Sequence, residues 1–392
     1  MNWASSVSER PELARAVDEC VAALREGLLG ETPDLLIGFV SPHHAAAHQE
    51  LPGRLQAAFP GALLLGCGGQ SVIGSGRELE GRPGLALCAA HLPGVSLSPF
   101  HLDASDVATL GDTPEHWPTL VGAQPSEDPH FILLGDPFSG DAEALAQSLD
   151  ASFPTSVKVG GLASGAQEPG ESALFLGDEI HRSGFVGLAL HGDVQVDAIV
   201  AQGCRPVGDP MFVTHCRGNV LHAVDGRQPM EVLGELFARA DPGERELLQH
   251  ALFLGIEMVS DRTEYGQGDF LIRNLTGGDP DGGALSVAAS LHDTQVVQFH
   301  VRDRHAAAED LARRLREYPG RHASGALLFS CLGRGEALYG EPDHDSRLFA
   351  ECLGSVPLTG FFCNGEIGPV QDRTFLHSYT SAFGIFRPRS VQ

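Results

Sequence analysis

Residues 55–69, LQAAFPGALLLGCGG, decide the fold, because residues 149–162, LDASFPTSVKVGGL, repeat the same order of features. In both stretches a segment that favours a helix ends in Phe-Pro, a short aliphatic strand follows, and glycines come at or after its end. The flanking segments match as well: 35–38 with 132–135, and Gly-Leu-Ala-Leu at 84–87 with the same tetrapeptide at 187–190. Shared features in one order predict a duplicated strand-helix-strand unit.

A third, more diverged copy follows later in the chain. Its predicted parts are a strand at 326–331, a helix at 345–353, a strand at 356–358, a loop at 361–366 and a closing strand at 381–386. The segment between the second and third copies has a different pattern. There we expect helices at 229–239 and 306–318, and strands near 270–272, 285–287 and 296–301.

The alternation of strands and helices predicts the fold class. Alternation within each copy favours some parallel pairing, whereas the paired strands after each glycine-rich loop are typical of meanders. We therefore expect an α/β (mixed α+β) protein with repeated strand-helix-strand units and mixed sheets, in two pseudo-repeated domains. The turn Asp225-Gly226-Arg227 places the predicted boundary at Val224, which gives domains 1–224 and 225–392.

Composition narrows the classes of partner. The 392 residues include 51 acidic and 26 basic side chains, a formal charge of −25, so DNA, RNA and anionic membranes would repel the protein. The first ten residues lack a basic segment followed by an apolar one, so we expect a cytoplasmic protein. Eight cysteines without any Cys-x-x-Cys pair predict reduced, mostly buried thiols.

Several motifs resemble one known family. They are Val207-Gly208 with Val213-Thr214, 271–274 (LIRN), 299–303 (FHVRD), and above all 357–369, PLTGFFCNGEIGP. Together they look like the FIST (F-box and intracellular signal transduction) proteins, with a FIST N-terminal domain over the first two copies and a FIST C-terminal domain over the rest. The resemblance implies a sensory module for small ligands, proposed to include amino acids, that is often coupled to histidine kinases, chemotaxis receptors or cyclases. Some relatives are described as haem-binding nitric-oxide sensors.

The loops that follow the first and second strands of each copy are the candidate binding site. Open α/β sheets usually bind ligands at the carboxyl ends of their strands. The predicted ligand-binding residues are Gly68, Gly69, Asp136, Lys158, Gly160, Gly161, Arg273, Arg334, Asn364, Gly365 and Glu366. The glycines would present backbone N–H groups to a ligand, or else would only make tight turns.

Glu366 is the most specific of these candidates, since a carboxylate in an apolar stretch needs a partner. That partner is either an ammonium or hydroxyl group of a ligand, or a structural group such as Arg334, Arg273 or backbone donors. An amino-acid ligand would need an anion site at the glycines with Arg273 or Arg334, and an ammonium site at Asp136 or Glu366. For Lys158 the alternative is an edge residue that points to water.

Other chemistries receive less support. His44 and His48 have helical spacing but no glutamate between them, so we expect no metal site. A haem, which needs an axial ligand, would use His377 or His300. A thiol-dependent enzyme would use Cys331 or Cys363 with His377.

The sequence therefore predicts a FIST-type protein without catalytic residues and without a cofactor. It would bind a small molecule, such as an amino acid or a related metabolite, and would signal to a separate partner such as a histidine kinase or cyclase. A haem-binding sensor and a thiol enzyme are the alternatives.

Overall fold

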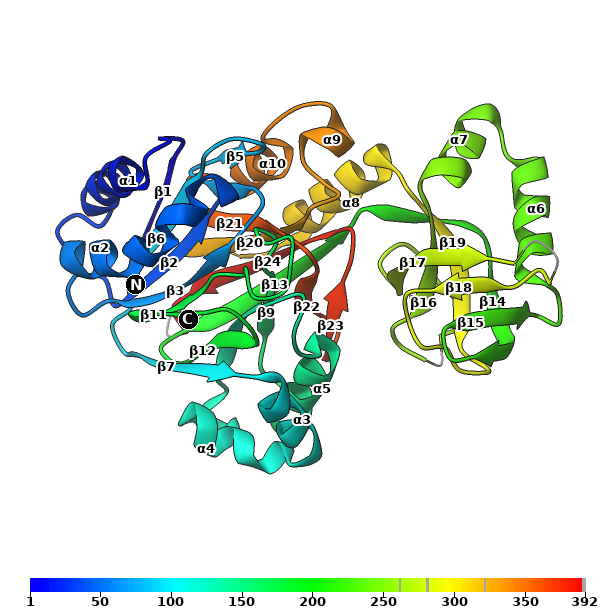
Figure 1. The fold of residues 1–392 in the computed structure, drawn as a ribbon, viewed down its shortest axis with the longest axis horizontal. Coiled ribbons are helices and arrows are strands. Elements are labelled where there is room, and N and C mark those ends of the chain that lie inside the picture. Colours follow the sequence, from blue (N-terminus) through cyan, green and yellow to red (C-terminus); the bar gives the residue numbers. More distant parts are fainter. Residues whose placement is uncertain (261, 280–281, 321, 390–392) are drawn as a thin grey trace. The chain divides into compact units, whose positions relative to one another are not determined.

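The computed structural model describes residues 1–260, 262–279, 282–320 and 322–389. They form two compact units, which Figure 1 shows with their elements labelled. The first comprises Met1–Val200, Ala312–Leu376 and the segment from Thr380 onward, and the second comprises Ala201–Leu311 and His377–Tyr379.

The first unit contains three copies of one arrangement. The first copy consists of β1 (Asn2–Ser8), α1 (Leu13–Gly27), β2 (Leu35–Val40), the 3₁₀ helix η1 (Pro42–Glu50), α2 (Leu51–Ala58), β3 (Leu63–Gly68), β4 (Val72–Gly74), β5 (Arg77–Leu79) and β6 (Leu85–His91). The second consists of β7 (Val95–Leu102), α3 (Ala104–Asp112), η2 (Pro114–His116), α4 (Trp117–Val121), η3 (Pro125–Glu127), β8 (His130–Gly135), α5 (Ala142–Ser152), β9 (Lys158–Leu162), β10 (Leu174–Leu176), β11 (Glu179–His181) and β12 (Phe185–Gly192). The third consists of β13 (Gln195–Gln202), β20 (Gly325–Cys331), α9 (Glu336–Tyr339), α10 (His344–Leu353), β21 (Leu358–Cys363), β22 (Glu366–Val370), β23 (Arg373–His377) and β24 (Thr380–Arg387).

The three copies exchange hairpins in a closed cycle. The sheets have the orders β1-β6-β2-β3-β10-β11, β7-β12-β8-β9-β22-β23 and β13-β24-β20-β21-β4-β5. The hairpin of the second copy thus completes the first sheet, that of the third copy completes the second sheet, and that of the first copy completes the third. Each sheet is mixed, with one parallel pair: β2 with β3, β8 with β9, or β20 with β21.

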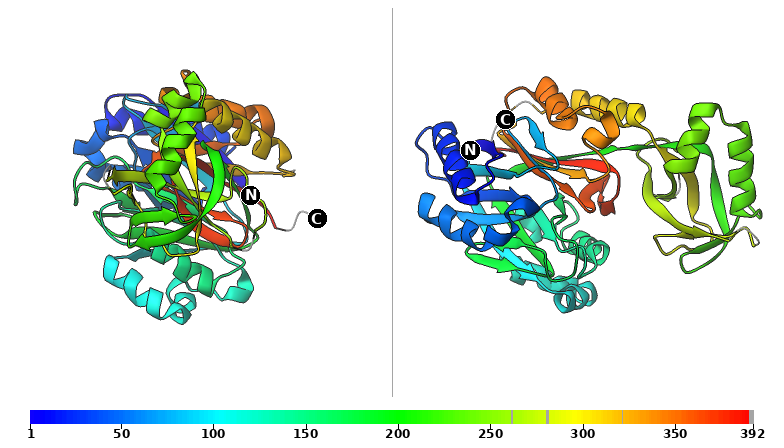
Figure 2. Two further views of the ribbon diagram at one scale, coloured as in Figure 1. Left: turned by 90° about the vertical axis from the view of Figure 1, so that its right-hand side faces the viewer. Right: turned by 45° about the horizontal axis from the view of Figure 1, so that its top comes forward.

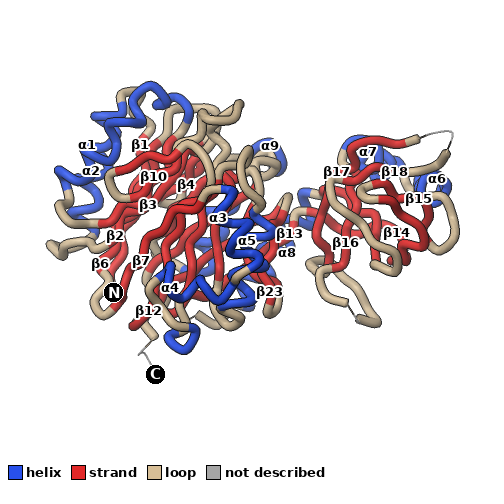
Figure 3. The backbone as a smooth tube through the Cα atoms, turned by 60° about the horizontal axis from the view of Figure 1, so that its bottom comes forward, coloured by secondary structure: helices blue, strands red, loops and turns tan. Residues whose placement is uncertain are grey.

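Alternation of side chains across the central strands gives each sheet two buried faces. In β2, Ile37 and Phe39 join an apolar core that also contains residues of the other two sheets, such as Leu134 and Phe329. The opposite face of β2, including Leu36, packs against α1 and α2. Helices therefore cover the outer faces of the sheets, as Figures 2 and 3 show from other directions. The side chains of the inner faces share one core.

Three equivalent glycines permit the parallel pairs. A Cβ added to Gly66, Gly160 or Gly360 would overlap the carbonyl oxygen of the neighbouring strand residue, Gly38, Leu133 or Leu328 respectively. These glycines occupy the same position in the three copies, which confirms the duplication and fixes its register.

That register corrects two details of the predicted repeat. The Gly-Leu-Ala-Leu tetrapeptides at 84–87 and 187–190 lie at the equivalent strands β6 and β12, as predicted. Gly38 and Leu133 are equivalent positions, because they face the equivalent glycines Gly66 and Gly160. Gly38 pairs with Leu87, the last residue of the first tetrapeptide, whereas Leu133 pairs with Gly187, the first residue of the second, so the two tetrapeptides are offset by three residues. Likewise 361–363, expected in a loop, lies inside β21, because the chain continues its parallel pairing with β20 to Cys363.

The second unit is a closed barrel with the strand order β14-β15-β18-β17-β16-β19. Its elements are β14 (Cys204–Arg217), β15 (Val220–Val224), α6 (Pro229–Arg239), α7 (Pro242–His250), β16 (Leu252–Glu257), β17 (Phe270–Gly278), β18 (Leu285–Val287) and β19 (Val296–Arg302), and α8 (Arg304–Glu317) follows. The helices α6 and α7 pack Leu233, Phe237 and Leu248 against Val207 and Val301 of the barrel. The predicted division at Val224 is not the division between the compact units, because Ala312–Leu376 and the segment from Thr380 onward belong to the first unit, where the hairpin of the third copy completes the second sheet.

The fold is mixed α+β, as the sequence predicts. Over the described ranges, no helix combines the length and the apolar character that a membrane span requires.

Candidate functional site

Glu366 occupies a position that is apolar in the other two copies. The residues that follow the three equivalent glycines are Cys67, Gly161 and Phe361. They pair across the exchanged hairpins with Leu174, Glu366 and Val72 respectively. Leu174 and Val72 are fully buried parts of the common core. A carboxylate at this position in the third copy alone is a specific substitution that core packing does not require.

The Glu366 side chain is completely buried and only half satisfied. Its Oε2 accepts hydrogen bonds from the Thr380 backbone N–H at 3.1 Å and from the Thr380 hydroxyl at 2.9 Å. Its Oε1 accepts no N–H or O–H hydrogen bond from any residue that the structure describes, although the Cys331 thiol interacts with the carboxyl group. Burial raises the pKa of Glu366 to about 8, although the Thr380 hydrogen bonds, the Arg334 charge and the Cys331 side chain act in the opposite direction.

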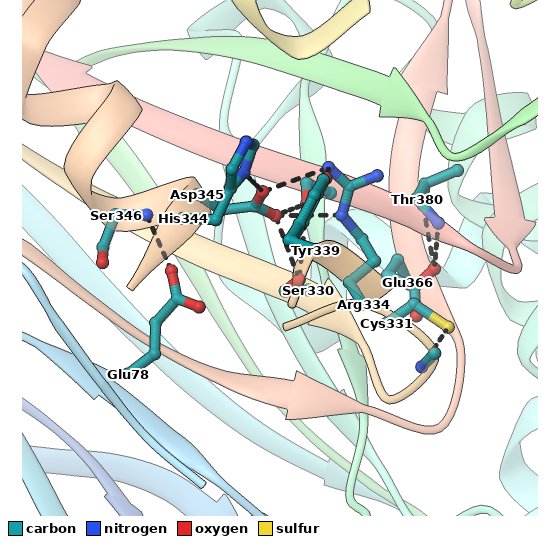
Figure 4. A network of polar contacts seen from close by, with 12 residues as sticks. Glu78, Ser330, Cys331, Arg334, Tyr339, His344, Asp345, Ser346, Glu366 and Thr380 are labelled. Atoms are coloured by element: carbon teal, nitrogen blue, oxygen red, sulfur yellow. Dashed lines mark hydrogen bonds and ion pairs between the residues drawn. The ribbon is translucent and has the colours of Figure 1, made fainter. Parts of the chain in front are cut away.

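The loop after β20 brings Arg334 into the same region, as Figure 4 shows. Arg334 is 1% exposed, and its Nε and Nη2 donate to the two carboxylate oxygens of Asp345 at 2.9 and 3.2 Å. Nη2 also donates to the Tyr339 hydroxyl. Nη1 lies on the side of the guanidinium away from Asp345 and has no acceptor among the described residues. One guanidinium N–H group is thus buried without a partner in the described part of the chain.

Asp345 is the centre of this network. It accepts further hydrogen bonds from the hydroxyl of Ser381 at 2.5 Å and contacts His344 Nδ1 at 3.0 Å. The His344 ring stacks on Tyr339 with 3.5 Å between ring centroids. Burial acts to raise the pKa of Asp345, but the Arg334 charge and the hydrogen bonds outweigh it and hold the pKa well below its usual range.

A second buried carboxylate reaches this region from the first copy. Glu78 of β5 accepts the Ser346 backbone N–H at 2.8 Å, near the start of α10, while its own N–H donates to Asp343. Its Oε2 has no hydrogen-bonding partner within the described ranges. Burial and the negative charge of Asp345 raise the pKa of Glu78 to about 8. The exchanged hairpin of the first copy therefore carries an acidic group into the third.

Two of the predicted ligand residues have protein partners in the structure. Asp136 accepts hydrogen bonds from Ser172 and Ser139, one at each oxygen and both at 2.5 Å. Lys158 is fully buried and donates to Asp150 at 2.8 Å, which corrects the alternative that it points to water. Burial lowers the pKa of Lys158, and Asp150 opposes that effect.

The predicted nest of glycine N–H groups is also corrected. The amides of Gly68 and Gly69 donate to the carbonyls of Ala173 and Val40, at 2.8 and 3.0 Å. Gly160 and Gly161 lie inside β9 rather than in a loop. Their lack of a side chain serves close packing, because a Cβ at Gly161 would press on the sulfur of Cys363.

Asn364 and Gly365 form the tight turn between β21 and β22. The Asn364 amide donates to the Leu162 carbonyl at 3.0 Å, and the Gly365 carbonyl accepts from the Leu162 amide at 2.9 Å. Gly365 has a φ of +126°, a conformation that favours glycine. The turn aims Glu366 inward, while Asn364 itself is exposed.

Arg273, His300 and His377 belong to the second compact unit. Arg273 donates to the Ile272 carbonyl at 3.0 Å. His300 Nδ1 lies 3.0 Å from the Gln298 carbonyl oxygen, and burial lowers its pKa to about 4. The His300 ring packs against Phe270, and a Cβ at Gly255 would already press on it, so these surroundings do not fit a haem ligand. His377 is fully buried at the end of β23.

Sequence reasoning missed Glu78, Tyr339, Asp345 and Thr380 as neighbours of the predicted pair Arg334 and Glu366. An acidic residue at the start of the predicted helix 345–353 was a visible signal, but nothing in the sequence identifies its partner. Among the described residues no group of three or more His, Cys, Asp and Glu side chains has the arrangement of a metal site. The buried Glu366 Oε1 and Arg334 Nη1 would suit a ligand with both a donor and an acceptor.

Family domains and related proteins match almost the whole chain. The FIST N domain matches residues 34–227 and the FIST C domain matches residues 229–369. An uncharacterized protein of Mycobacterium tuberculosis strain H37Rv is 36% identical over 386 residues, 97% of this chain and 98% of the relative. An uncharacterized protein of Mycobacterium bovis is 35% identical over 388 residues, 97% of each chain. A crystal structure of cyanuric acid hydrolase from A. caulinodans aligns with 99% of this chain and 100% of its own, at 10% identity and a TM-score of 0.33.

Proposed function

The chain belongs to the FIST family, whose domains are associated with signal transduction and small-ligand sensing, and from this premise we propose that it is a sensor of a small polar molecule. The proposed ligand contacts Glu366 and Arg334 in the third copy. The observation that carries the proposal is a pair of completely buried polar atoms: Arg334 Nη1, which has no acceptor among the described residues, and Glu366 Oε1, which accepts no N–H or O–H hydrogen bond from them and has only the weakly donating Cys331 thiol near its carboxyl group. Burying such atoms without hydrogen bonds is costly, so a binding function is the simplest reason to retain them.

The chemistry of the two atoms indicates the ligand class. In its ionised form Glu366 accepts from an ammonium or hydroxyl group, and the Arg334 guanidinium N–H donates to a carboxylate or carbonyl. An amino acid, or a related small metabolite that carries both groups, satisfies both atoms at once. The apolar equivalents Val72 and Leu174 support one such site in the protein rather than three.

The proposal is for a binding protein that reports occupancy to a separate signalling protein, such as a histidine kinase or a cyclase. The association of FIST domains with signal transduction supports this output. The ligand contacts lie beside Thr380 at the start of β24 and beside α10, through Asp345, so occupancy would act directly on two elements of the third copy.

Thermal-shift titration of the full chain with the twenty amino acids and with simple amines tests the proposal. A bound ligand raises the melting temperature in proportion to the logarithm of its concentration above its Kd. Glu366→Gln keeps the shape of the side chain and should abolish the shift from the ligand that stabilises the wild type. Glu78→Gln is the matched control, because Glu78 is also a buried glutamate whose pKa is raised to about 8. This variant should keep the ligand-induced rise in melting temperature. An undiminished shift in Glu366→Gln would refute the site.

A further inference from the structure

Cys331 and Cys363 lie side by side at the ends of neighbouring parallel strands. They are register partners in the β20–β21 pair, so their side chains emerge on the same face of the sheet. Adjacent strands are about 4.7–4.9 Å apart, and disulfides form at Cα separations of about 4.4–6.8 Å. The backbone positions of these two cysteines therefore already suit a disulfide, although both are thiols in the structure.

The surroundings of Cys331 favour a reactive sulfur. Its Sγ accepts the Gly333 backbone N–H at 3.4 Å. The guanidinium of Arg334 interacts electrostatically with Cys331, and the Cys331 side chain in turn interacts with Glu366. The Gly333 N–H and the Arg334 charge favour the thiolate of Cys331, whereas its burial and the negative charge of an ionised Glu366 oppose it; the Glu366 carboxyl group can also accept and return a proton.

The two thiols differ in access to solvent. Cys331 is 9% exposed and is followed by Leu332, which is 42% exposed. Cys363 is fully buried, and burial holds its pKa well above the usual range. An oxidant reaches Cys331 first, and Cys363 then stands as the neighbouring thiol that resolves the product.

The pair is confined to the third copy. The positions equivalent to Cys331 carry Ser41 and Asp136, and those equivalent to Cys363 carry Gly69 and Ala163. Ser41 shows that a serine fits this strand end. Cys331→Ser is therefore a conservative replacement.

From this geometry we propose that Cys331 is an oxidation-sensitive nucleophile that hydroperoxides convert, through Cys331 and Cys363, to a disulfide. In the first step the Cys331 sulfur attacks the terminal oxygen of the hydroperoxide and the O–O bond breaks. The departing oxygen takes the thiol proton, relayed by Glu366, so that sulfenic acid and water (or an alcohol) form. In the second step the Cys363 sulfur displaces the sulfenic oxygen, which leaves as water with the Cys363 proton. Two thiols are oxidised and one hydroperoxide is reduced.

Hydrogen peroxide treatment of the full chain, followed by alkylation and peptide mass mapping, tests this proposal. We expect a loss of 2 Da (about the mass of two hydrogens) that maps to a Cys331–Cys363 linkage and is reversed by dithiothreitol. In Cys363→Ser the reaction should stop at a Cys331 sulfenic acid that dimedone traps. Cys331→Ser should form no linkage to Cys363.

Cys216 and Cys352 provide internal controls, because both are more exposed than Cys331. We expect Cys331 to oxidise at least about ten-fold faster than either, since reactivity follows thiolate character as well as exposure. Equal rates, or a disulfide that persists in Cys331→Ser, would overturn the proposal. The oxidation is measured without ligand, so it is independent of the proposed binding site. If no disulfide forms, the ligand-induced rise in melting temperature still tests Glu366. If no ligand raises the melting temperature, the disulfide can still form.

Discussion

Glu366 of β22 lies directly opposite Gly161 of β9, across the antiparallel pair that joins the third copy to the second. The sulfur of Cys363 fills the space that a Cβ at Gly161 would take, so this position requires glycine. The acidic residue, its glycine partner and the thiol therefore form one packed group. A substitution at any one of these three residues should therefore alter the packing of the other two.

Glu366→Gln should flatten the dependence of stability on pH. The folded-state pKa of Glu366 is about 8, against an ordinary value of 4.5, so between these values the native state binds more protons than the unfolded state. The free energy of unfolding then falls as pH rises, by at most about 1.4 kcal/mol per pH unit for this group. The variant should resemble wild type near pH 5 and exceed it in stability near pH 8, measured by urea unfolding.

Glu78→Gln should remove a second part of the same slope, because its pKa is also about 8. The double variant should be flatter than either single one. Variants whose unfolding free energies keep the wild-type slope from pH 5 to pH 8 would show that these carboxyls ionise normally.

Asp345→Asn should destabilise the protein strongly. It removes the charge that faces the buried Arg334, and breaking one side of a buried pair costs about 3–5 kcal/mol. The control is Glu50→Gln, which breaks the exposed pair with Arg54 and should change the free energy of unfolding by less than about 1 kcal/mol. Similar effects of the two changes on chemical denaturation would contradict the assignment of Asp345 as the centre of the network.

Gly66→Ala, Gly160→Ala and Gly360→Ala should each lower the melting temperature markedly, because each new Cβ would overlap a backbone carbonyl oxygen. The three effects should be alike if the copies are structurally equivalent. Gly53→Ala is the control: it lies in α2 with no atom within 4 Å of the added Cβ, and alanine favours a helix by about 1 kcal/mol. If one of the three variants keeps the wild-type melting temperature, its copy is not structurally equivalent to the other two.

Haem should not be needed for folding. Because the neighbours of His300 already enclose its ring, protein prepared without haem should unfold cooperatively, and added haem should give no stoichiometric Soret band. The measurement is absorption spectroscopy of wild type and of His300→Ala and His377→Ala. A stoichiometric band that disappears in His377→Ala would make His377 an axial ligand.

The local parts of the fold were predictable from sequence, because local signals produce them. The helix at 229–239 has the predicted bounds, since Pro229 begins it and its apolar spacing is regular. The exchange of hairpins was not predictable. The strand β4 has three residues, and Val72 pairs with Phe361, far away in the sequence, so no local pattern records the partner.

The candidate site was predictable to the same extent. Glu366 stands out as a charge in an apolar stretch, and Arg334 follows a predicted strand. The ion pair of Arg334 with Asp345 and the approach of Glu78 depend on tertiary packing between separate copies. The sequence predicts a loop at Gly160 and Gly161, because glycine in a sequence signals a turn more often than close strand packing, but both residues lie in β9.

The cyclic exchange of hairpins has a consequence for the order in which the chain can fold on the ribosome. The second sheet needs β22 and β23, and the third copy must be synthesised before β4 and β5 have a sheet to join. Only the first sheet can be completed from the first two copies. The nascent chain must therefore hold an open β9 edge while the continuous segment from Ala201 to Leu311 emerges. Open strand edges are sites of aggregation, so this protein should depend on chaperones during synthesis more than its composition suggests.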